Sequence, residues 1–170
     1  MVGQPRVPGP VSWRGDRRMV ARPYRSVDLG ACLAVFDSNV PRFFRSEERG
    51  EFASYLRALP GPYVVLRMED REVVACGGYA VREEAAVGDL CWGMVRRDLH
   101  GLGLGRALAR LRLGALRADP RARRVELNTS QHTVGFYEAM GFRTLAVQPD
   151  GYGPGLDRCQ MRLSFGEGGS

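Results

Sequence analysis

A glycine loop at residues 100–106 is the feature that most constrains this chain. The loop reads His-Gly-Leu-Gly-Leu-Gly-Arg, so Gly101, Gly103 and Gly105 alternate with leucines. Glycine has no Cβ, so a bound group can approach the main chain and successive N–H groups can point into one concavity. Because a long helix begins at this loop, its first N–H groups lack helical partners and its positive dipole end faces the same place. The loop therefore predicts a site for a phosphate or another anion, to which Arg106 adds a charged donor.

The spacing of the glycines excludes two familiar phosphate loops. G-x-G-x-G differs from the dinucleotide-binding G-x-G-x-x-G, and the chain contains no G-x-x-x-x-G-K-[ST]. A tight turn between a strand and a helix, without any ligand, is the simpler alternative for such a loop. The helix that follows has one apolar face and ends before Asp119-Pro120.

Composition narrows the classes of protein to consider. A chain of 170 residues with 44% hydrophobic and 26% charged residues suits one globular domain. No apolar run approaches the roughly 20 residues of a membrane span, and no apolar signal segment follows the N-terminus. The four cysteines are scattered and the two histidines are too few for a metal set. We therefore expect a cytoplasmic protein with reduced cysteines, no metal and no membrane partner.

The basic residues give no sign of a nucleic-acid partner. The formal charge is +6, and all 25 basic residues are arginines because the chain contains no lysine. These arginines are spread among acidic residues and accompany no nucleic-acid motif, so we expect no nucleic acid to bind.

Strands and helices alternate unevenly along the chain. Residues 1–18 and 166–170 lack apolar periodicity, and we expect a flexible extension and a flexible tail there. Residues 19–165 read as one domain. Strands are predicted at 19–25, 63–68, 73–81, 89–95, 124–129, 142–147 and 157–165, and helices at 26–37, 46–59, 104–118 and 132–140.

Taken together, the motifs resemble the GNAT N-acetyltransferase superfamily. Its acyl-CoA pyrophosphate loop is a polar residue followed by x-x-G-x-G, as at residues 100–105, although His100 stands where the family usually has Arg or Gln. The family signature Phe-Tyr-Glu-x-x-Gly-Phe fits residues 136–142. The resemblance covers residues 19–165 and implies the single-domain α/β (α+β) acyl-CoA N-acyltransferase fold. That fold is a mixed, mostly antiparallel sheet flanked by helices, with strands four and five splayed apart.

The resemblance implies acetyl-CoA as the co-substrate and assigns its contacts. The pantetheine arm would enter the gap between the splayed strands and pair like an added strand with Gly93, Met94 and Val95. The diphosphate would lie on the loop at Gly101, Leu102, Gly103, Leu104, Gly105 and Arg106. A glycine inside an apolar strand also indicates a bulge or a close backbone approach, or a tolerated packing imperfection. His100 is expected either to bind a phosphate or to face solvent.

Two side chains are candidates for proton transfer. In the family, the tyrosine that matches Tyr137 protonates the departing thiolate, although a partly buried tyrosine can simply be a core residue. Asp89 matches the position where histone-type members carry a glutamate base, and an exposed acid at a strand entry would look the same. Glu126 is a weaker candidate because it alternates with Val125 and Leu127. A water or a main-chain carbonyl could also take the proton.

We therefore predict an N-acetyltransferase that moves the acetyl group of acetyl-CoA to a primary amine of a small molecule or protein. The two substrates would meet in one ternary complex, with proximity supplying much of the rate. A non-catalytic acyl-CoA-binding module is the alternative. Phe43, Phe44 and Trp92 are the predicted acceptor contacts, although helix-packing aromatics would look the same. Homodimers are common in the family, and the sequence leaves the oligomeric state open.

Overall fold

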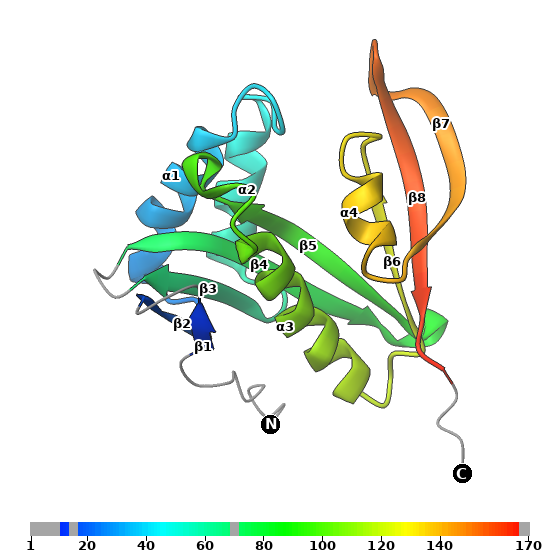
Figure 1. The fold of residues 1–170 in the computed structure, drawn as a ribbon, viewed down its shortest axis with the longest axis horizontal. Coiled ribbons are helices and arrows are strands. Elements are labelled where there is room, and N and C mark those ends of the chain that lie inside the picture. Colours follow the sequence, from blue (N-terminus) through cyan, green and yellow to red (C-terminus); the bar gives the residue numbers. More distant parts are fainter. Residues whose placement is uncertain (1–10, 14–16, 69–71, 167–170) are drawn as a thin grey trace. The chain divides into compact units, whose positions relative to one another are not determined.

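The computed structural model describes residues 11–13, 17–68 and 72–166 (Figure 1). The α-helices are α1 (Leu29–Ser38), α2 (Glu48–Ala58), α3 (Leu104–Ala118) and α4 (Val134–Glu138). The strands are β1 (Val11–Trp13), β2 (Arg17–Pro23), β3 (Tyr63–Met68), β4 (Val73–Arg82), β5 (Val87–Val95), β6 (Arg124–Thr129), β7 (Arg143–Gly153) and β8 (Leu156–Ser164). By its contacts the chain forms two compact units.

The first unit comprises Met1–Tyr79 and Cys91–Ala115. Its strands follow the order β1-β2-β3-β4-β5, with antiparallel pairing from β1 to β4. α1 and α2 cover one face of these strands, where Phe36, Phe52 and Val65 are fully buried. α3 covers the other face, where Leu104 and Leu108 pack against β3 and β4 (Figure 1).

The predicted apolar stripe of α3 is buried at Leu104 and Leu108, whereas its other two members, Leu111 and Ala115, are half-buried. Leu104 and Leu108 are each 1% exposed, and the helix ends at Ala118, directly before Asp119-Pro120. The helix also buries a charged residue on this side, because Arg112 is only 4% exposed. Arg112 follows Leu108 by four residues, so it lies on the same face of the helix.

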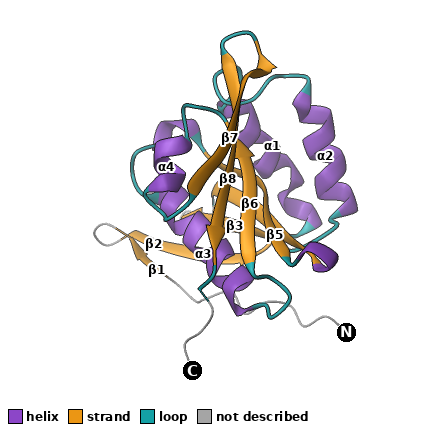
Figure 2. Ribbon diagram, turned by 90° about the vertical axis from the view of Figure 1, so that its right-hand side faces the viewer, coloured by secondary structure: helices purple, strands orange, loops and turns teal. Residues whose placement is uncertain are grey.

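The second unit comprises Ala80–Leu90 and Leu116–Ser170. Its strands follow the order β5-β6-β8-β7, and Figure 2 shows the long hairpin of β7 and β8 beside β6. β5 and β6 are parallel, and their ladder joins the three residues from Val87 to Asp89 with those from Arg124 to Glu126. β5 then continues for six more residues to Val95.

The predicted elements agree closely with the structure. β3 and β6 match their predicted bounds, and the mixed, mostly antiparallel sheet is confirmed. Val11–Trp13, inside the predicted extension, forms β1 and pairs with β2. The rest of the predicted extension up to residue 16, and residues 167–170 of the predicted tail, lie outside the described residues. Within the described part of the chain, no helix has the length and apolarity to cross a bilayer.

Candidate functional site

The glycine loop has the backbone geometry that a ring of N–H donors requires. Gly101 and Gly103 have φ angles of 77° and 89°, in the left-handed region that side chains disfavour. A Cβ at Gly101 would meet no atom within 4 Å, so its conformation rather than crowding requires glycine there. α3 begins at Leu104, and Ala107 N donates to Gly103 O at 3.0 Å. The amides before Ala107 therefore form the donor-rich N-terminus of a 15-residue helix.

Two side chains at the start of α3 have opposite surroundings, because Leu104 is buried and Arg106 is exposed. Leu104 is buried against β3 and β4, so only its main chain can face a ligand. Arg106 is exposed in the first turn of the helix. The predicted diphosphate contacts thus combine main-chain groups at the helix start with one exposed guanidinium.

His100 turns away from the loop and toward the end of β5. Its Nε2 lies 2.8 Å from Val95 O, and its ring packs edge-on against Phe43 at 5.2 Å between centroids. Asn39, which is buried, donates its Nδ2 to the same carbonyl at 2.9 Å and to Val35 O at 2.8 Å. His100 is exposed, as expected for a solvent-facing residue, and its ring also has a main-chain partner; the phosphate contact stays a prediction.

β5 carries an irregularity at the predicted place. Trp92 has a φ of 43°, and Gly93 follows it with an exposed main chain. We call these two residues the β5 kink. The predicted irregularity at Gly93 is thus present, with the left-handed residue one position earlier. Beyond the kink, Met94 is buried and Val95 is half-buried.

The predicted acceptor contacts have different surroundings. Trp92 lies among core aromatic rings, 5.2 Å from Phe52 and 6.1 Å from Phe44 between centroids. Phe44 is also stacked on Phe36 at 5.0 Å. Phe43 is 39% exposed. Of the three, Phe43 has the ring surface that an acceptor could reach most easily.

Three features of this site were not predicted from the sequence. Tyr63, which is 3% exposed, donates its hydroxyl to Trp92 O at 2.9 Å. The Arg112 guanidinium lies against Gly93, where a Cβ would be 2.6 Å from both terminal nitrogens. Gly77 and Gly78 in β4 make room for Arg112 and for the Tyr63 ring. The available signals were a glycine pair inside an apolar strand and an arginine at a buried position of a helix.

In the second unit, Tyr137 is half-buried in α4. Its ring makes edge contacts with Phe136 at 5.0 Å and Phe142 at 5.4 Å, and Phe142 N donates to Tyr137 O at 3.1 Å. Among the residues that the structure describes, the Tyr137 hydroxyl makes no hydrogen bond. The ring is therefore held by packing while its hydroxyl is available to a ligand.

Asp89 and Glu126 belong to an ion-pair network in the same unit. Arg82 donates to both oxygens of Asp89, at 2.7 and 3.0 Å, and lies 3.6 Å from Glu126. Arg124 and Arg162 also bind Glu126, each at 2.9 Å. Hydrogen bonds from Arg124 and Arg162 lower the pKa of Glu126 although partial desolvation opposes this. Arginines thus hold the Glu126 carboxylate in its charged form, and Asp89 forms an ion pair with Arg82.

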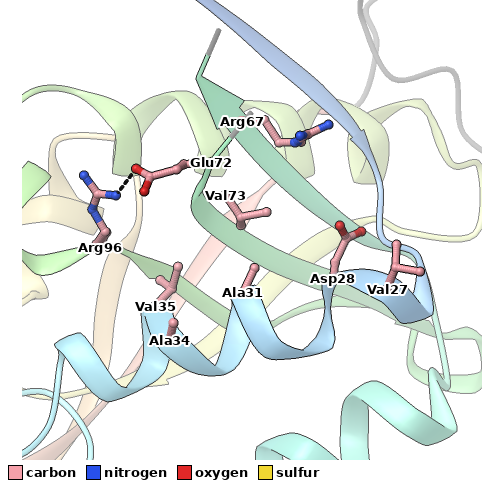
Figure 3. A pocket seen from close by; sticks show the side chains of 9 residues that line it. All are labelled: Val27, Asp28, Ala31, Ala34, Val35, Arg67, Glu72, Val73 and Arg96. Atoms are coloured by element: carbon pink, nitrogen blue, oxygen red, sulfur yellow. Dashed lines mark hydrogen bonds and ion pairs between the residues drawn. The ribbon is translucent and has the colours of Figure 1, made fainter. Parts of the chain in front are cut away.

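A separate cleft lies between α1 and the β3–β4 pair, with a volume of about 490 Å³ (Figure 3). Arg96 closes one end, where it donates to Glu72 at 2.5 Å and to Asp98 at 2.7 Å. Asp28, at the other end, accepts two hydrogen bonds from Arg22, each at 2.7 Å. These charged groups stabilise the fold around the cleft, and we assign no chemistry to it. No cluster of His, Cys, Asp and Glu among the described residues suits a metal ion.

The fold and the glycine loop define an acyl-CoA N-acyltransferase. The family model described as an acetyltransferase (GNAT) domain matches residues 42–165. A GNAT-family protein from Desulfovibrio desulfuricans is 25% identical with a TM-score of 0.74, over 86% of this chain and 98% of its own. The ribosomal-protein-S18-alanine N-acetyltransferase from Escherichia coli is 20% identical with a TM-score of 0.71, over 89% and 97%.

An aminoglycoside 6′-N-acetyltransferase complexed with coenzyme A is 12% identical with a TM-score of 0.72, over 89% of this chain and 99% of its own. No curated protein sequence matches the chain. The chain belongs to the GNAT acetyltransferase family, so the resemblance and the fold predicted from it are confirmed. It is an acetyl-CoA-dependent acetyltransferase.

Proposed function

We propose that this enzyme transfers the acetyl group of acetyl-CoA to a primary amine of a small molecule or protein, by direct attack in a ternary complex. The observation that carries the proposal is the left-handed pair Gly101 and Gly103 at the start of α3. Such a loop suits a diphosphate because it offers main-chain donors and a helix dipole together. Arg106 adds a cation, and the predicted contacts from Gly101 to Arg106 are retained as the diphosphate site.

The exposed main chain of Gly93 supports a contact with the rest of the cofactor. Past the three-residue ladder with β6, β5 continues to Val95. An extended group can add to such a strand through main-chain hydrogen bonds. We propose that Gly93, Met94 and Val95 bind the pantetheine arm in this way.

The chemistry requires one proton to leave the amine and one to reach the thiolate. An amine with a pKa near ~10.4 is neutral in only about one molecule in a thousand at pH 7, a cost of roughly 4 kcal/mol. We propose that Asp89 removes this proton, directly or through a water, and that the Tyr137 hydroxyl donates one to the leaving sulfur. Tyr137 has the free hydroxyl that this role needs, whereas Asp89 is held by Arg82.

The exposed ring of Phe43 supports a proposal for the class of acceptor. Phe43 presents ring surface beside His100, and Arg42 lies 5.6 Å from the centre of the Phe43 ring. We propose an amine with an apolar portion that packs on Phe43. Relatives in fold include enzymes named for a ribosomal-protein alanine and for an aminoglycoside, so both protein and small-molecule amines belong in a substrate screen.

Two measurements test the function. Isothermal titration calorimetry with acetyl-CoA tests cofactor binding, and a panel of amines assayed for free thiol tests transfer. Binding followed by amine-dependent thiol release is the expected result. Binding without release by any amine would instead identify a non-catalytic acyl-CoA-binding module, and absence of binding would contradict both functions.

A further inference from the structure

The β5 kink is held from the face that α1 and α2 cover. Tyr63 stands opposite Gly78 in the β3–β4 ladder, and a Cβ on Gly78 would lie only 2.7 Å from Tyr63 Cδ2. The missing side chain therefore lets the tyrosine ring lie over β4. From there its hydroxyl reaches the Trp92 carbonyl on the next strand at 2.9 Å.

The Tyr63 hydroxyl is a permanent donor. Burial raises the pKa of Tyr63 well above its ordinary value of 10.0. The group therefore stays protonated across the physiological range and donates to Trp92 O throughout it. Trp92 needs such a restraint because its φ of 43° is uncommon for a residue with a side chain.

The same kink is held from the face that α3 covers. The Arg112 guanidinium fills the space beside Gly93 and Gly77, and it donates to Leu108 O at 3.3 Å and to Gly78 O at 3.4 Å. Gly93 has no Cβ, so the guanidinium can lie directly against the main chain of the kink. A larger residue at Gly93 would move either the strand or the arginine.

We propose that Tyr63 and Arg112 are positioning residues that hold the β5 kink in the conformation that presents Gly93, Met94 and Val95 to the thioester arm of acetyl-CoA. The inference rests on the proposed function, because it deepens the role of the same strand. Neither residue needs to touch the cofactor. Their effect is confined to the arm, since the diphosphate binds the separate loop at Gly101 to Arg106.

The test compares two ligands on Tyr63→Phe, which keeps the ring and removes the hydroxyl. Acetyl-CoA carries the arm, whereas 3′-phospho-ADP carries the diphosphate without it. Loss of one buried hydrogen bond should weaken acetyl-CoA binding by roughly five- to tenfold and leave 3′-phospho-ADP binding within about twofold. Tyr24→Phe is the matched control, because its ring lies 5.8 Å from Tyr63 in the same cluster. It should change neither affinity.

Arg112 is tested in the same way with Arg112→Met, which keeps an apolar stem. Should that variant fail to fold, Gly77→Ala reads the same contact from β4, because a Cβ there would lie 2.9 Å from a terminal nitrogen of Arg112 and Gly77 is not a proposed cofactor contact. The same split between the two ligands is expected. An equal loss of affinity for both ligands, or no loss for either, would overturn the positioning role. The proposed function would still stand in that case, provided that the wild-type protein binds acetyl-CoA. Failure of the wild type to bind acetyl-CoA would instead contradict the proposed function itself.

Discussion

Asp89 and Glu126 are direct partners in the parallel ladder of β5 and β6, and Arg82 contacts both carboxylates. Neighbouring carboxylates repel each other, and a cation that contacts both offsets this repulsion. Here Arg82 provides that cation, and Arg124 and Arg162 add two more around Glu126. The network explains how two acidic residues can be direct partners in the ladder. Because the two carboxylates have different sets of arginine partners, the contribution of each can be tested by its own substitution.

Asp89→Asn should lower kcat by roughly 100-fold if Asp89 accepts the amine proton, because general bases contribute at least about that factor. Steady-state kinetics with a substrate found in the amine screen would measure it. Arg82→Gln is the matched control, since it breaks the same ion pair but keeps the carboxylate. It should retain turnover. Equal kcat values for wild type and both variants would show that Asp89 only pairs with Arg82.

Glu126→Gln should lower the free energy of unfolding by about 1 kcal/mol at pH 7, since it removes the charge that three arginines bind. Because the folded pKa of Glu126 lies below its ordinary value of 4.5, its stabilisation is present above pH 4.5 and disappears as pH falls through the folded pKa. Urea unfolding at a series of pH values would show the two curves converging in acid.

Glu84→Gln is the control for this charge removal, because Glu84 is exposed and makes no ion pair among the described residues. It should have little effect at any pH. A loss for Glu126→Gln that persists unchanged in strong acid would contradict the role of the charge and point to packing instead.

If Tyr137 is the general acid, Tyr137→Phe should reduce kcat by about 100-fold or more while acetyl-CoA affinity stays the same, because the proposed proton transfer to the thiolate occurs after the cofactor is bound. The ring contacts with Phe136 and Phe142 are kept in this variant, so its thermal stability should also be preserved. Rapid kinetics and calorimetry on the same preparation separate the two effects. An unchanged kcat would remove the assigned acid.

The sequence predicted those parts of the site whose cause is local. The φ angles of Gly101 and Gly103 and the start of α3 follow from residues next to one another in the chain. The stripe of α3 follows from helical periodicity. The role proposed for Tyr137 came from the resemblance to the family, because no spacing of residues implies it.

The parts that could not be predicted depend on register between strands. Tyr63 reaches Trp92 only because Gly78 stands opposite it, and the pairing of residues 63 and 78 is a property of the folded hairpin. Arg112 sits at an apolar position of its helix, where arginine is rare unless its donors are satisfied. Its contact with Gly93 joins two elements whose packing the sequence does not specify. The acceptor contact at Trp92 stays a prediction; the residue is half-buried and its ring packs against Phe52.

A substitution at Gly101 tests whether the glycine loop binds the diphosphate. Gly101→Ala places a side chain at a φ of 77°, which costs roughly 1 kcal/mol or more, and the Cβ itself would meet open space. If the N–H groups of this loop bind the diphosphate, relaxation of the strained backbone should weaken both acetyl-CoA and 3′-phospho-ADP by about tenfold. Gly114→Ala is the matched control, because Gly114 is an exposed glycine inside α3 with no atom within 4 Å of its Cβ position. That change should add roughly 0.5–1 kcal/mol of stability and leave both affinities intact. Calorimetry and thermal unfolding of the two variants would decide the matter: full affinity for both ligands in Gly101→Ala would mean that the diphosphate is bound elsewhere.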